Sequence, residues 1–540
     1  MKHYDRQNPK PEFVIGLAGP VGTDMRLVSQ ILAQELRAYR YHPLHIRVSD
    51  LIQSWCSDEV QGVISDAKED LRIDRLMNAG DLIRSAAGTG AGVMPLVVSA
   101  IRHARQKTLL AEGCEIDFED VELYNHCFII NSLKHPDEVE VLRRIYGEKF
   151  VMVSAVLSQS KRKEYLQSKI AKSYNRTDYS SFSQKAEFLI EKDRRRSGSS
   201  LGQNISGTFH LADYFLRANE CIEKDAKRLL HMLFGHPGVT PTRNEFVMFE
   251  ARSNALRSGD LSRQVGAVVT NSNLEIVSRG CNEVPTVGGD TYWADDEGVL
   301  DTRDYAAGRD FNAVKKVEIL EELFEFLDSN SFLKVESSND GPGHSKSSQR
   351  LVSQLVFGDK KGAFKDLRVS NLIEFGRMVH AEMFALMEAA RRGLAVEGGT
   401  LYCTTFPCHM CARHIIAAGI REVFYIEPYP KSMTQELYGD MVSIEPNPDE
   451  VEQSRNISRP AKVYFQPFHG AAPRIFQAAF EMPKRKDEQG YRLPYDEEKA
   501  RPKWISLSKS HIPLEAMFAS VLRSVPIVAD VTAITGKNVQ

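Results

Sequence analysis

Two short motifs in the second half of the chain constrain its structure and chemistry more than any other feature. The first is His380-Ala381-Glu382, and the second is Pro407-Cys408-His409-Met410-Cys411. An imidazole nitrogen and two thiolates supply three ligands of a tetrahedral zinc ion, and the fourth position then stays open for water. The two cysteines stand three residues apart at the start of a predicted helix, so their sulfur atoms face one side, and a helix N-terminus favours the thiolate. The sequence therefore predicts that His380, Cys408 and Cys411 hold one Zn²⁺ per chain.

Glu382 stands two residues after the predicted histidine ligand and is not expected to bind the metal. Zinc lowers the pKa of a bound water towards about 7, which yields a hydroxide nucleophile. A carboxyl group beside that water can carry its proton to the substrate. Glu382 is therefore the candidate catalytic residue.

The alternative to a catalytic zinc is a structural zinc, which normally takes a fourth ligand from the protein. His409, between the two cysteines, and Cys403, on the preceding predicted strand, are the nearest candidates for that ligand. We expect His409 to face solvent and Cys403 to pack in the core. The sequence thus favours an open, catalytic site.

Length and charge restrict the classes of protein that are possible. The chain has 540 residues, which predicts about two to four domains. With 8 cysteines, the thiols are expected to be reduced and the location to be cytoplasmic. The net charge of −3 provides no overall electrostatic footprint for nucleic acid or a membrane surface. No apolar run approaches the roughly 18 residues of a membrane helix, so no membrane partner is expected.

Strand-like and helix-like segments alternate along the first half, which favours an α/β domain with a parallel sheet. Predicted strands cover residues 13–18, 43–48, 126–130 and 150–157, and predicted helices cover residues 26–37, 75–87, 94–105 and 136–146. The pattern restarts with a helix at 244–256, a hairpin at 265–270 and 275–280, a helix at 379–392, a strand at 400–405, a helix at 408–418 and a strand at 422–427. We expect domains at 1–238 and 239–480, an extension at 481–540, and an insertion at about 286–375. The insertion is predicted to contain a helix at 315–327 and a low-complexity segment without regular structure at 336–350.

Four segments together resemble the deoxycytidylate deaminase family. They are SRQVGAV at 262–268, GCNEVP at 280–285, HAE at 380–382 and TTFPCHMC at 404–411. The resemblance implies a cytidine-deaminase-like α/β/α domain that converts a free deoxycytidine nucleotide into the deoxyuridine nucleotide with zinc. It also implies that Asn282 and Thr404 contact the substrate. Arg263 could reach a substrate phosphate or pair with a structural carboxylate, and both remain open.

The insertion carries a second resemblance, to bacterial two-domain anti-phage dCTP/dCMP deaminases. The segments that carry it are Tyr292-Trp293, DTRDY at 301–305 and Gly308-Arg309-Asp310. That family joins an N-terminal P-loop kinase-like parallel α/β domain to the deaminase. The resemblance implies depletion of the dCTP and dCMP pools during phage replication. It further implies control by a regulatory nucleotide or a small RNA, and assembly as a homo-oligomer.

The loop Gly19-Pro20-Val21-Gly22-Thr23-Asp24-Met25-Arg26 follows a predicted strand and opens a helix, where backbone amides can cradle a phosphate. Gly19, Gly22 and Thr23 are the candidate nucleotide-binding residues. Compared with G-x-x-x-x-G-K-[ST], however, Asp24 replaces the second glycine, Met25 the lysine and Arg26 the hydroxyl residue. We therefore expect a degenerate P-loop that does not transfer phosphoryl groups. Regulatory binding and a plain scaffold both remain open.

The leading hypothesis is thus a zinc-dependent deaminase of free dCTP or dCMP, used in anti-phage defence, with a regulatory N-terminal domain. One alternative is a deaminase that edits nucleic acid, which would share the zinc motif but need a basic groove with stacking aromatic residues. Another is a housekeeping dCMP deaminase fused to a ligand-binding module. The sequence does not discriminate between the mono- and the triphosphate substrate.

Overall fold

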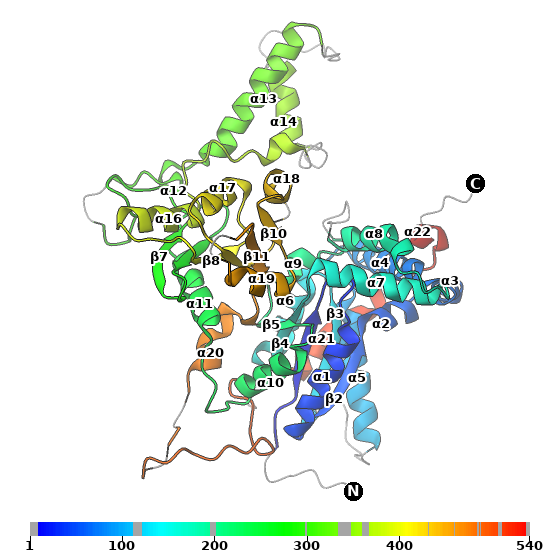
Figure 1. Ribbon diagram of the computed structural model, residues 1–540. Helices are drawn as coiled ribbons and strands as arrows, with labels where there is room; N and C mark the ends of the chain where they lie inside the picture. The colour runs from blue at the N-terminus through cyan, green and yellow to red at the C-terminus, as the bar shows by residue number, and fades with distance from the viewer. Residues whose placement is uncertain are drawn as a thin grey trace.

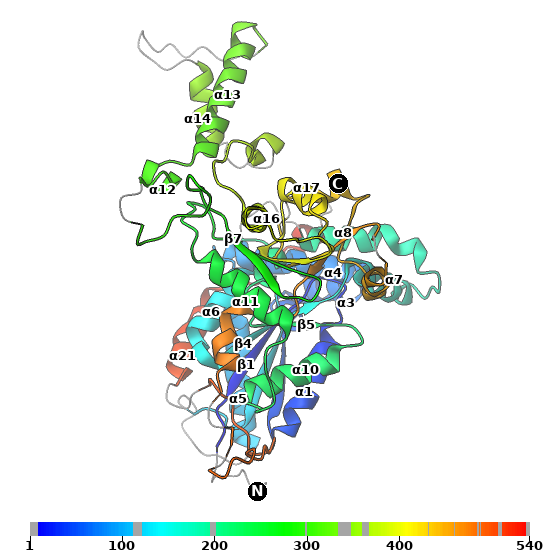
Figure 2. The same ribbon diagram turned by 60° about the vertical axis from the view of Figure 1, so that its left-hand side comes forward.

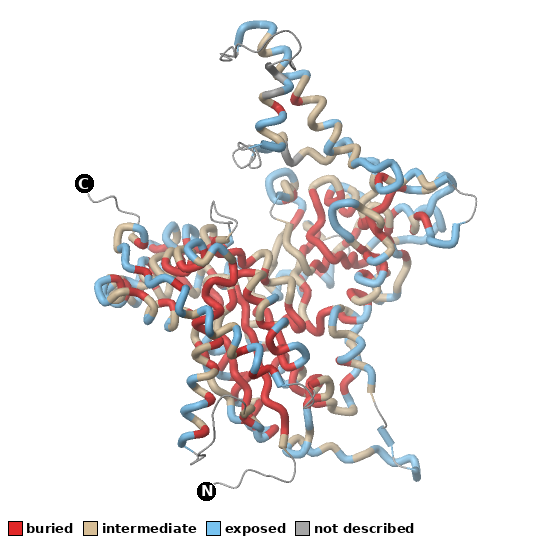
Figure 3. Tube along the Cα trace, turned by 180° about the vertical axis from the view of Figure 1, so that it is seen from behind, coloured by how far each residue is buried: buried red, intermediate tan, exposed pale blue. Residues whose placement is uncertain are grey.

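A computed structural model shows a mixed α/β protein built on two six-stranded sheets (Figure 1). The structure describes residues 9–111, 121–194, 201–296, 300–332, 347–358, 367–429, 431–457, 460–482, 485–486, 488–505 and 510–535. The strands of both sheets consist mainly of buried residues, and the helices around them carry the exposed residues (Figure 3). Among the described residues, no helix is long and apolar enough to cross a membrane.

The first sheet belongs mainly to the N-terminal half and has the order β12-β5-β4-β1-β3-β2. Its strands are parallel apart from the short β12, and their bounds are β1 Phe13–Ala18, β2 His42–Arg47, β3 His126–Leu133, β4 Phe150–Val156, β5 Tyr214–Arg217 and β12 Gly470–Ala471. The central β1 is buried along its whole length, which explains its apolar sequence FVIGLA. The expected parallel α/β arrangement of this half is confirmed.

Helices cover both faces of the first sheet, as right-handed crossovers between parallel strands require. They are α1 Met25–Ala38, α2 Val48–Ser54, α3 Asp58–Ser65, α4 Glu69–Ala86, α5 Met94–Ala111, α6 Pro136–Tyr146, α7 Gln159–Ser173, α8 Ser183–Arg194, α9 Ile205–Phe209 and α10 Ile222–Leu233. The chain passes from β1 to β2 on one side and from β3 to β4 on the other, although β1 and β3 are neighbours. The connections between strands therefore lead to opposite sides of the sheet on either side of the β1–β3 pair. A crevice is expected at the carboxyl ends of these two strands.

The second sheet has the order β10-β11-β9-β8-β6-β7. Its strands are β6 Gly266–Thr270, β7 Ile276–Cys281, β8 Thr400–Thr405, β9 Glu422–Glu427, β10 Val442–Ile444 and β11 Val463–Pro467. β6 is antiparallel to both β7 and β8, and the remaining pairs are parallel, so the predicted hairpin at 265–280 is confirmed. The helices of this half are α11 Arg243–Ala255, α16 Ala381–Arg391, α17 His409–Ala417, α18 Thr434–Tyr438 and α19 Pro448–Arg455.

Part of the insertion projects from the second half as a helical hairpin (Figure 1). After the short α12 (Asp304–Ala307), α13 (Phe311–Ser329) packs against α14 (Ser347–Val356). The prediction of no regular structure at 336–350 was wrong for the residues from Ser347 onward, which begin α14; residues 336–346 lie outside the described residues. The sequence signal was lost because α14 starts within a Ser-rich stretch, whose helix propensity is weak, and packing against α13 stabilises it.

The C-terminal segment returns to the N-terminal half. β12 pairs antiparallel with β5, α20 (Phe476–Phe480) follows it, α21 (Ile512–Ser520) packs against α5, and α22 (Val531–Thr535) packs against α4. Figure 2 shows α21 on the outside of the first half. Arg105 of α5 forms ion pairs of 2.6 Å with both Glu12 and Glu515, all three nearly inaccessible to solvent. Burial opposes ionisation of Glu12, but Arg105 and the hydrogen bond from His511 lower its pKa to about 2. This cluster therefore fastens the extension to the first half.

The two halves share one apolar core. Val247, Tyr402 and Phe424 of the second half belong to the same buried cluster as Phe215 and Phe468 beside the first sheet. Phe215 and Phe468 meet edge to face with ring centroids 5.9 Å apart, and Tyr402 stacks on Phe424 at 5.2 Å. The proposed boundaries at residues 238 and 480 remain predictions.

Candidate active site

The three predicted metal ligands lie together at the starts of two neighbouring helices. Nδ1 of His380 is 3.3 Å from Sγ of Cys408 and 3.4 Å from Sγ of Cys411, and the three ligand atoms all lie within 4.8 Å of one another. A tetrahedral zinc with Zn–N of about 2.0 Å and Zn–S of about 2.3 Å separates its nitrogen and sulfur ligands by about 3.5 Å. The observed spacing fits one zinc ion without rearrangement.

Strand ends and a close helix–sheet contact place these ligands. The buried β8 runs directly into Phe406, Pro407 and Cys408, and Cys408 is the N-cap of α17. His380 is the N-cap of α16, and the preceding Val379 exchanges two backbone hydrogen bonds with Glu283, of 3.0 and 3.2 Å. A side chain at Gly280 of β7 would collide with the backbone of α16 at Ala381, so a glycine permits this approach.

His380 makes no side-chain cap hydrogen bond to α16, and Cys408 interacts with Cys411 in the first turn of α17. The first-turn amides and the positive ends of both helix dipoles are therefore available to the ligand cluster, where they favour negative charge. The hydrogen bond from Cys411, followed by His380, lowers the pKa of the Cys408 thiol, while burial opposes this. The hydrogen bond with Cys408 in turn raises the pKa of His380. The cluster thus stabilises a thiolate, the form that binds a metal ion.

Glu382 lies in the first turn of α16 and is only 4% exposed. Burial, and next the negative charge of Cys408, raise the pKa of its carboxyl group, and its side chain also interacts with Cys411. A carboxyl group with a raised pKa exchanges protons near neutral pH more readily than an exposed one. The structure therefore brings Glu382 to the ligand cluster without making it a member.

No fourth protein ligand joins this cluster within the described part of the chain, and its members are His380, Cys408 and Cys411. Cys403 is fully buried in the core of the second half, as expected. His409 is half-buried rather than fully solvent-facing, with an Nδ1 that has no hydrogen-bond partner in the structure. A set of three ligands is the arrangement of catalytic rather than structural zinc sites.

Asn282 lies near the metal ligands, and it binds protein groups. Its Oδ1 accepts a hydrogen bond of 2.7 Å from the amide of Val265, and its Nδ2 donates to Asp260 at 2.6 Å and to the carbonyl of Arg263 at 2.9 Å. The side chain is 5% exposed. Asn282 thus fixes the loop between α11 and β6, and one acceptor position on its oxygen stays available.

Thr404 and Arg263 border the same loop. Thr404 accepts a hydrogen bond of 3.1 Å from the amide of Gly266. Arg263 forms a 3.0 Å ion pair with Glu427, lies 6.0 Å from the ring centre of Tyr429, and is half exposed. The structure therefore supplies the carboxylate partner that sequence analysis left open for Arg263.

Sequence analysis missed two acidic residues that organise this loop. Glu283 is 2% exposed and accepts hydrogen bonds from the amides of Gly259 at 2.6 Å and Val284 at 2.9 Å. Asp260 accepts from Asn282 and from the amide of Ser262. The available signal was an acid shortly after the end of a predicted strand, as in Cys281-Asn282-Glu283.

The N-terminal loop has the predicted position between β1 and α1, but carboxylates occupy several of its amides. Asp24 caps α1 and accepts hydrogen bonds from the amides of Arg26 and Leu27, at 3.1 and 3.2 Å. The amide of Val21 donates to Asp193 at 2.6 Å. These amides are the ones that a phosphate would need.

The three candidate residues of this loop differ in their roles. Gly22 has φ +91°, and a side chain there would collide with the backbone of Arg162. At Gly19, the Met25 side chain fills the space that a side chain would take. Thr23 is 8% exposed, and its hydroxyl has no hydrogen-bond partner in the structure. The glycines thus serve close packing, and their role in nucleotide binding stays a prediction.

Comparison with known proteins finds a family for part of the second half. Residues 241–427 match the family described as the cytidine and deoxycytidylate deaminase zinc-binding region. This range contains the three candidate ligands and Glu382. This stretch of the chain is therefore similar to the zinc-binding region of that family.

Individual relatives match over shorter stretches. The deoxycytidylate deaminase of Enterobacteria phage T4 is 44% identical over 54 residues, which are 10% of this chain and 28% of that protein. ComE operon protein 2 of Bacillus subtilis (strain 168) is 40% identical over 63 residues, 12% of this chain and 33% of that protein. The chain therefore spans only about a third of the length of the curated relatives it matches.

Among solved structures, the dCMP deaminase of cyanophage S-TIM5 in complex with dCMP and dUMP is similar to part of this chain. It is 17% identical, with 43% of this chain and 100% of that chain covered, at a TM-score of 0.21. The apo form of the same enzyme gives 16% identity, 42% and 100% coverage, and a TM-score of 0.19. These TM-scores are too low to establish a shared fold.

Proposed function

We propose that this protein is a zinc-dependent deaminase that hydrolyses the 4-amino group of free deoxycytidine nucleotides. The observation that carries the proposal is the juxtaposition of a three-ligand His/Cys/Cys cluster and a buried carboxyl group, Glu382, outside the ligand set. The family match over residues 241–427 and the short identities with deoxycytidylate deaminases support it.

In the proposed reaction, water adds to C4 of the cytosine ring and ammonia leaves, so that a carbonyl replaces the amino group. Zinc held by His380, Cys408 and Cys411 would supply the Lewis acidity that makes water a nucleophile near neutral pH. Glu382 accepts the proton of that water, passes it to the ring nitrogen N3, and then helps to protonate the departing amine. Its burial and its raised pKa support this shuttle, because a raised pKa moves proton exchange by the carboxyl group towards neutral pH.

The pocket residues of the proposal are Asn282, Thr404 and Arg263. Asn282 holds the loop and retains one acceptor position towards a sugar hydroxyl or a base edge. Arg263 is half exposed, lies over Tyr429 and forms a surface ion pair with Glu427, which contributes little stability. A substrate phosphate could therefore replace Glu427 as its partner at small cost. This feature favours a free nucleotide, either dCMP or dCTP.

We further propose that the N-terminal half controls this activity by binding a nucleotide. The shared core and the return of β12 to the first sheet support mechanical coupling of the halves. The resemblance of the insertion motifs to two-domain anti-phage deaminases supports a role in depleting the nucleotide pool during infection. Assembly as a homo-oligomer and control by a small RNA belong to the same proposal.

The decisive experiment is a product assay on the full chain with dCMP, dCTP and a cytosine-containing single-stranded DNA. We expect release of ammonia with dUMP or dUTP, and no conversion in the DNA. Glu382→Gln should lower kcat by about 10²–10⁴-fold, because general acid–base catalysis contributes that much, while zinc content stays unchanged.

Glu397→Gln, an exposed residue soon after α16, is the matched control and should keep full activity. Conversion of the DNA but not of the free nucleotides would contradict the proposed substrate class. Full activity of Glu382→Gln would contradict the mechanism.

A further inference from the structure

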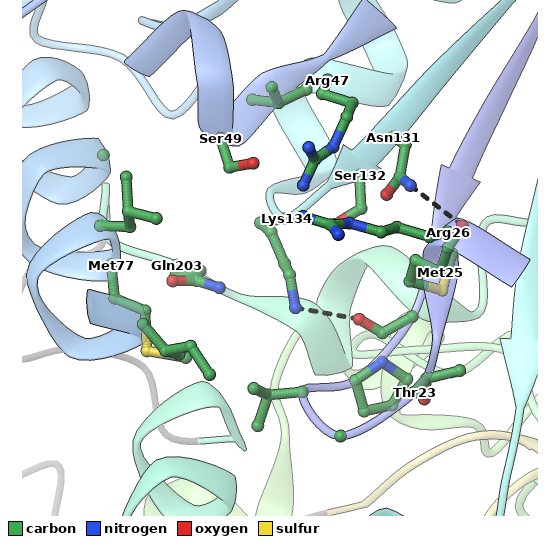
Figure 4. Close-up of a pocket in the computed structure, with 18 of the residues that line it drawn as sticks. Thr23, Met25, Arg26, Arg47, Ser49, Met77, Asn131, Ser132, Lys134 and Gln203 are labelled. Carbon is green, nitrogen blue, oxygen red and sulfur yellow. Dashed lines mark hydrogen bonds between the residues drawn. The ribbon is translucent and has the colours of Figure 1, made fainter. Parts of the chain in front are cut away.

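The N-terminal half contains a pocket that the deaminase chemistry does not use. It lies at the carboxyl ends of β1, β2 and β3 and has a volume of about 230 Å³. Figure 4 shows Arg26, Arg47, Lys134 and Met77 reaching it from different parts of the chain. The strand order reverses between β1 and β3, and an open α/β sheet typically binds its ligands in the crevice at such a point.

Positive charge dominates the lining. Six cationic side chains line the pocket, and Asp24 is the one acid among the lining residues: the cations are Arg26, Arg47, Arg72, Arg84, Lys134 and Lys169. Four of these already pair with buried or half-buried carboxylates: Arg72 and Lys169 with Glu69, Arg84 with Glu138, and Lys134 with Asp193. The charge available to a ligand therefore comes first from Arg26 and Arg47.

Arg26 and Arg47 are weakly held, and Lys134 lies beside them in a more strongly bonded position. Arg26 forms no ion pair with any described residue, and Arg47 pairs at 3.1 Å with Asp50, whose side chain is 59% exposed. Lys134 donates to the carbonyl of Gly19 at 2.9 Å and pairs with Asp193 at 3.0 Å. Exposed ion pairs exchange partners at low cost. A phosphate could thus bind Arg26 and Arg47 directly, and it could bind Lys134 while that side chain keeps its ion pair with Asp193.

Carboxylates already occupy three amides of the loop and of the first turn of α1. Asp24 and Asp193 accept hydrogen bonds from the amides of Arg26, Leu27 and Val21, and Met25 lies over Gly19. A bound phosphate would meet the negative charge of Asp24 at this place. Side chains rather than these three amides are therefore expected to provide the anion site, which favours a single phosphate group over a chain of several.

The remaining surface of the pocket is apolar or neutral. Ile52, Leu76 and Met77 form an apolar part of the lining, and Ser49 and Ser132 add hydroxyl groups. In Figure 4, Met77 lies across the pocket from Arg26. The hydroxyl of Thr23, more than nine-tenths buried and without a partner in the structure, also lines the pocket. A ligand that fits has one anionic end and one flat, largely apolar end.

We propose that this pocket binds a nucleoside 5′-monophosphate, with the phosphate between Arg26, Arg47 and Lys134 and the base against Ile52, Leu76 and Met77. The proposal names the ligand class and the site for the regulatory role given above to the N-terminal half. An effect of this ligand on deamination rests on the proposed regulatory role. Binding of the monophosphate does not, because it requires neither zinc nor Glu382.

The test is calorimetric titration of the full-length Glu382→Gln protein. The probes are AMP, dGMP and dTMP, with adenosine, inorganic phosphate and ATP for comparison, and dCMP is left out because it would also bind at the proposed deaminase site. At least one monophosphate should bind at micromolar to submillimolar concentration, and adenosine and phosphate more weakly. Arg26→Ala and Arg47→Ala should each weaken that binding by about tenfold, the usual effect of losing one charge-assisted hydrogen bond.

Arg37→Ala is the matched control, because Arg37 is an exposed arginine in the last turn of the same helix α1 and does not line the pocket. It should leave the affinity unchanged. The proposal is overturned if no monophosphate binds at 1 mM, if the two pocket variants bind as tightly as the control, or if ATP binds more tightly than every monophosphate. Loss of deamination with intact monophosphate binding would count against the proposed enzyme alone.

Discussion

The two halves of the molecule both place candidate binding residues at the N-termini of helices, but they use these N-termini in opposite ways. At the starts of α16 and α17 the N-cap residues are the candidate metal ligands His380 and Cys408. His380 makes no cap hydrogen bond to its helix, and Cys408 interacts with the third candidate ligand, Cys411, in its own first turn. At the start of α1 the N-cap is Asp24, which accepts hydrogen bonds from two amides of the first turn. The N-termini of α16 and α17 therefore present candidate metal ligands, whereas the carboxylate of Asp24 occupies the N-terminus of α1.

The difference shows how a helix N-terminus acquires or loses a function. Each N-terminus carries a partial positive charge that favours an anion. In the second half the anion is the thiolate of Cys408, which can also bind a metal ion. In the first half it is the carboxylate of Asp24, and ligand recognition is left to side chains of other elements. The residue at the N-cap thus decides whether the backbone takes part in binding.

The largest effect is expected from removing one metal ligand. Cys411→Ala or His380→Ala should reduce the zinc content from one ion per chain to none, because two ligands hold zinc poorly. Deamination should then fall by about 10³-fold or more, since the activation of water is lost. Elemental analysis and the product assay measure both effects.

Cys221→Ser, a half-buried cysteine at the start of α10, is the control for loss of a thiol. It should keep metal and activity. If Cys411→Ala retained a full equivalent of zinc, the starts of α16 and α17 would not hold the metal, and the contrast with the capped start of α1 would be contradicted.

An intermediate effect is expected when a chelator removes the metal from the intact protein. The first-turn amides of α16 and α17 should exchange with deuterium about ten- to a hundredfold faster, because a bound ligand stabilises the states that contain it. The first turn of α1 should exchange at an unchanged rate, since Asp24 caps it. Hydrogen exchange read by mass spectrometry compares the three helices in one sample, and equal responses would contradict the comparison.

The smallest effect is expected at the N-terminal loop. Asp24→Ala removes both cap bonds and should lower the free energy of unfolding by about 1 kcal/mol. In a protein of this size that change lowers Tm by only a few degrees. Asp24→Asn keeps the acceptor oxygen and should melt close to the unchanged protein, so a scanning calorimeter separates the two variants. Equal Tm values for Ala and Asn would show that the cap contributes nothing.

Local sequence signals predicted the metal ligands and most strands, because their information lies within a few residues. The spacing of Cys408 and Cys411 fixes both sulfur atoms on one helix turn, and the apolar run of β1 requires burial. The roles of Asn282 and of the pocket around Arg26 could not be predicted in the same way. Both depend on residues far apart in the sequence. Asn282 bonds Asp260, and the pocket brings Arg26 together with Arg47 and Lys134. Only the fold brings these groups together.

Pairing of β12 with β5 has a consequence for the order in which the protein is made. Residues 214–217 leave the ribosome long before residues 470–471, and the whole second sheet is synthesised between them. At about 5–20 residues per second, the edge of β5 stays uncovered for on the order of tens of seconds. An uncovered strand edge is a template for pairing with other chains. Nascent chains of this protein are therefore most exposed to aggregation, and most dependent on chaperones, while the second half is being translated.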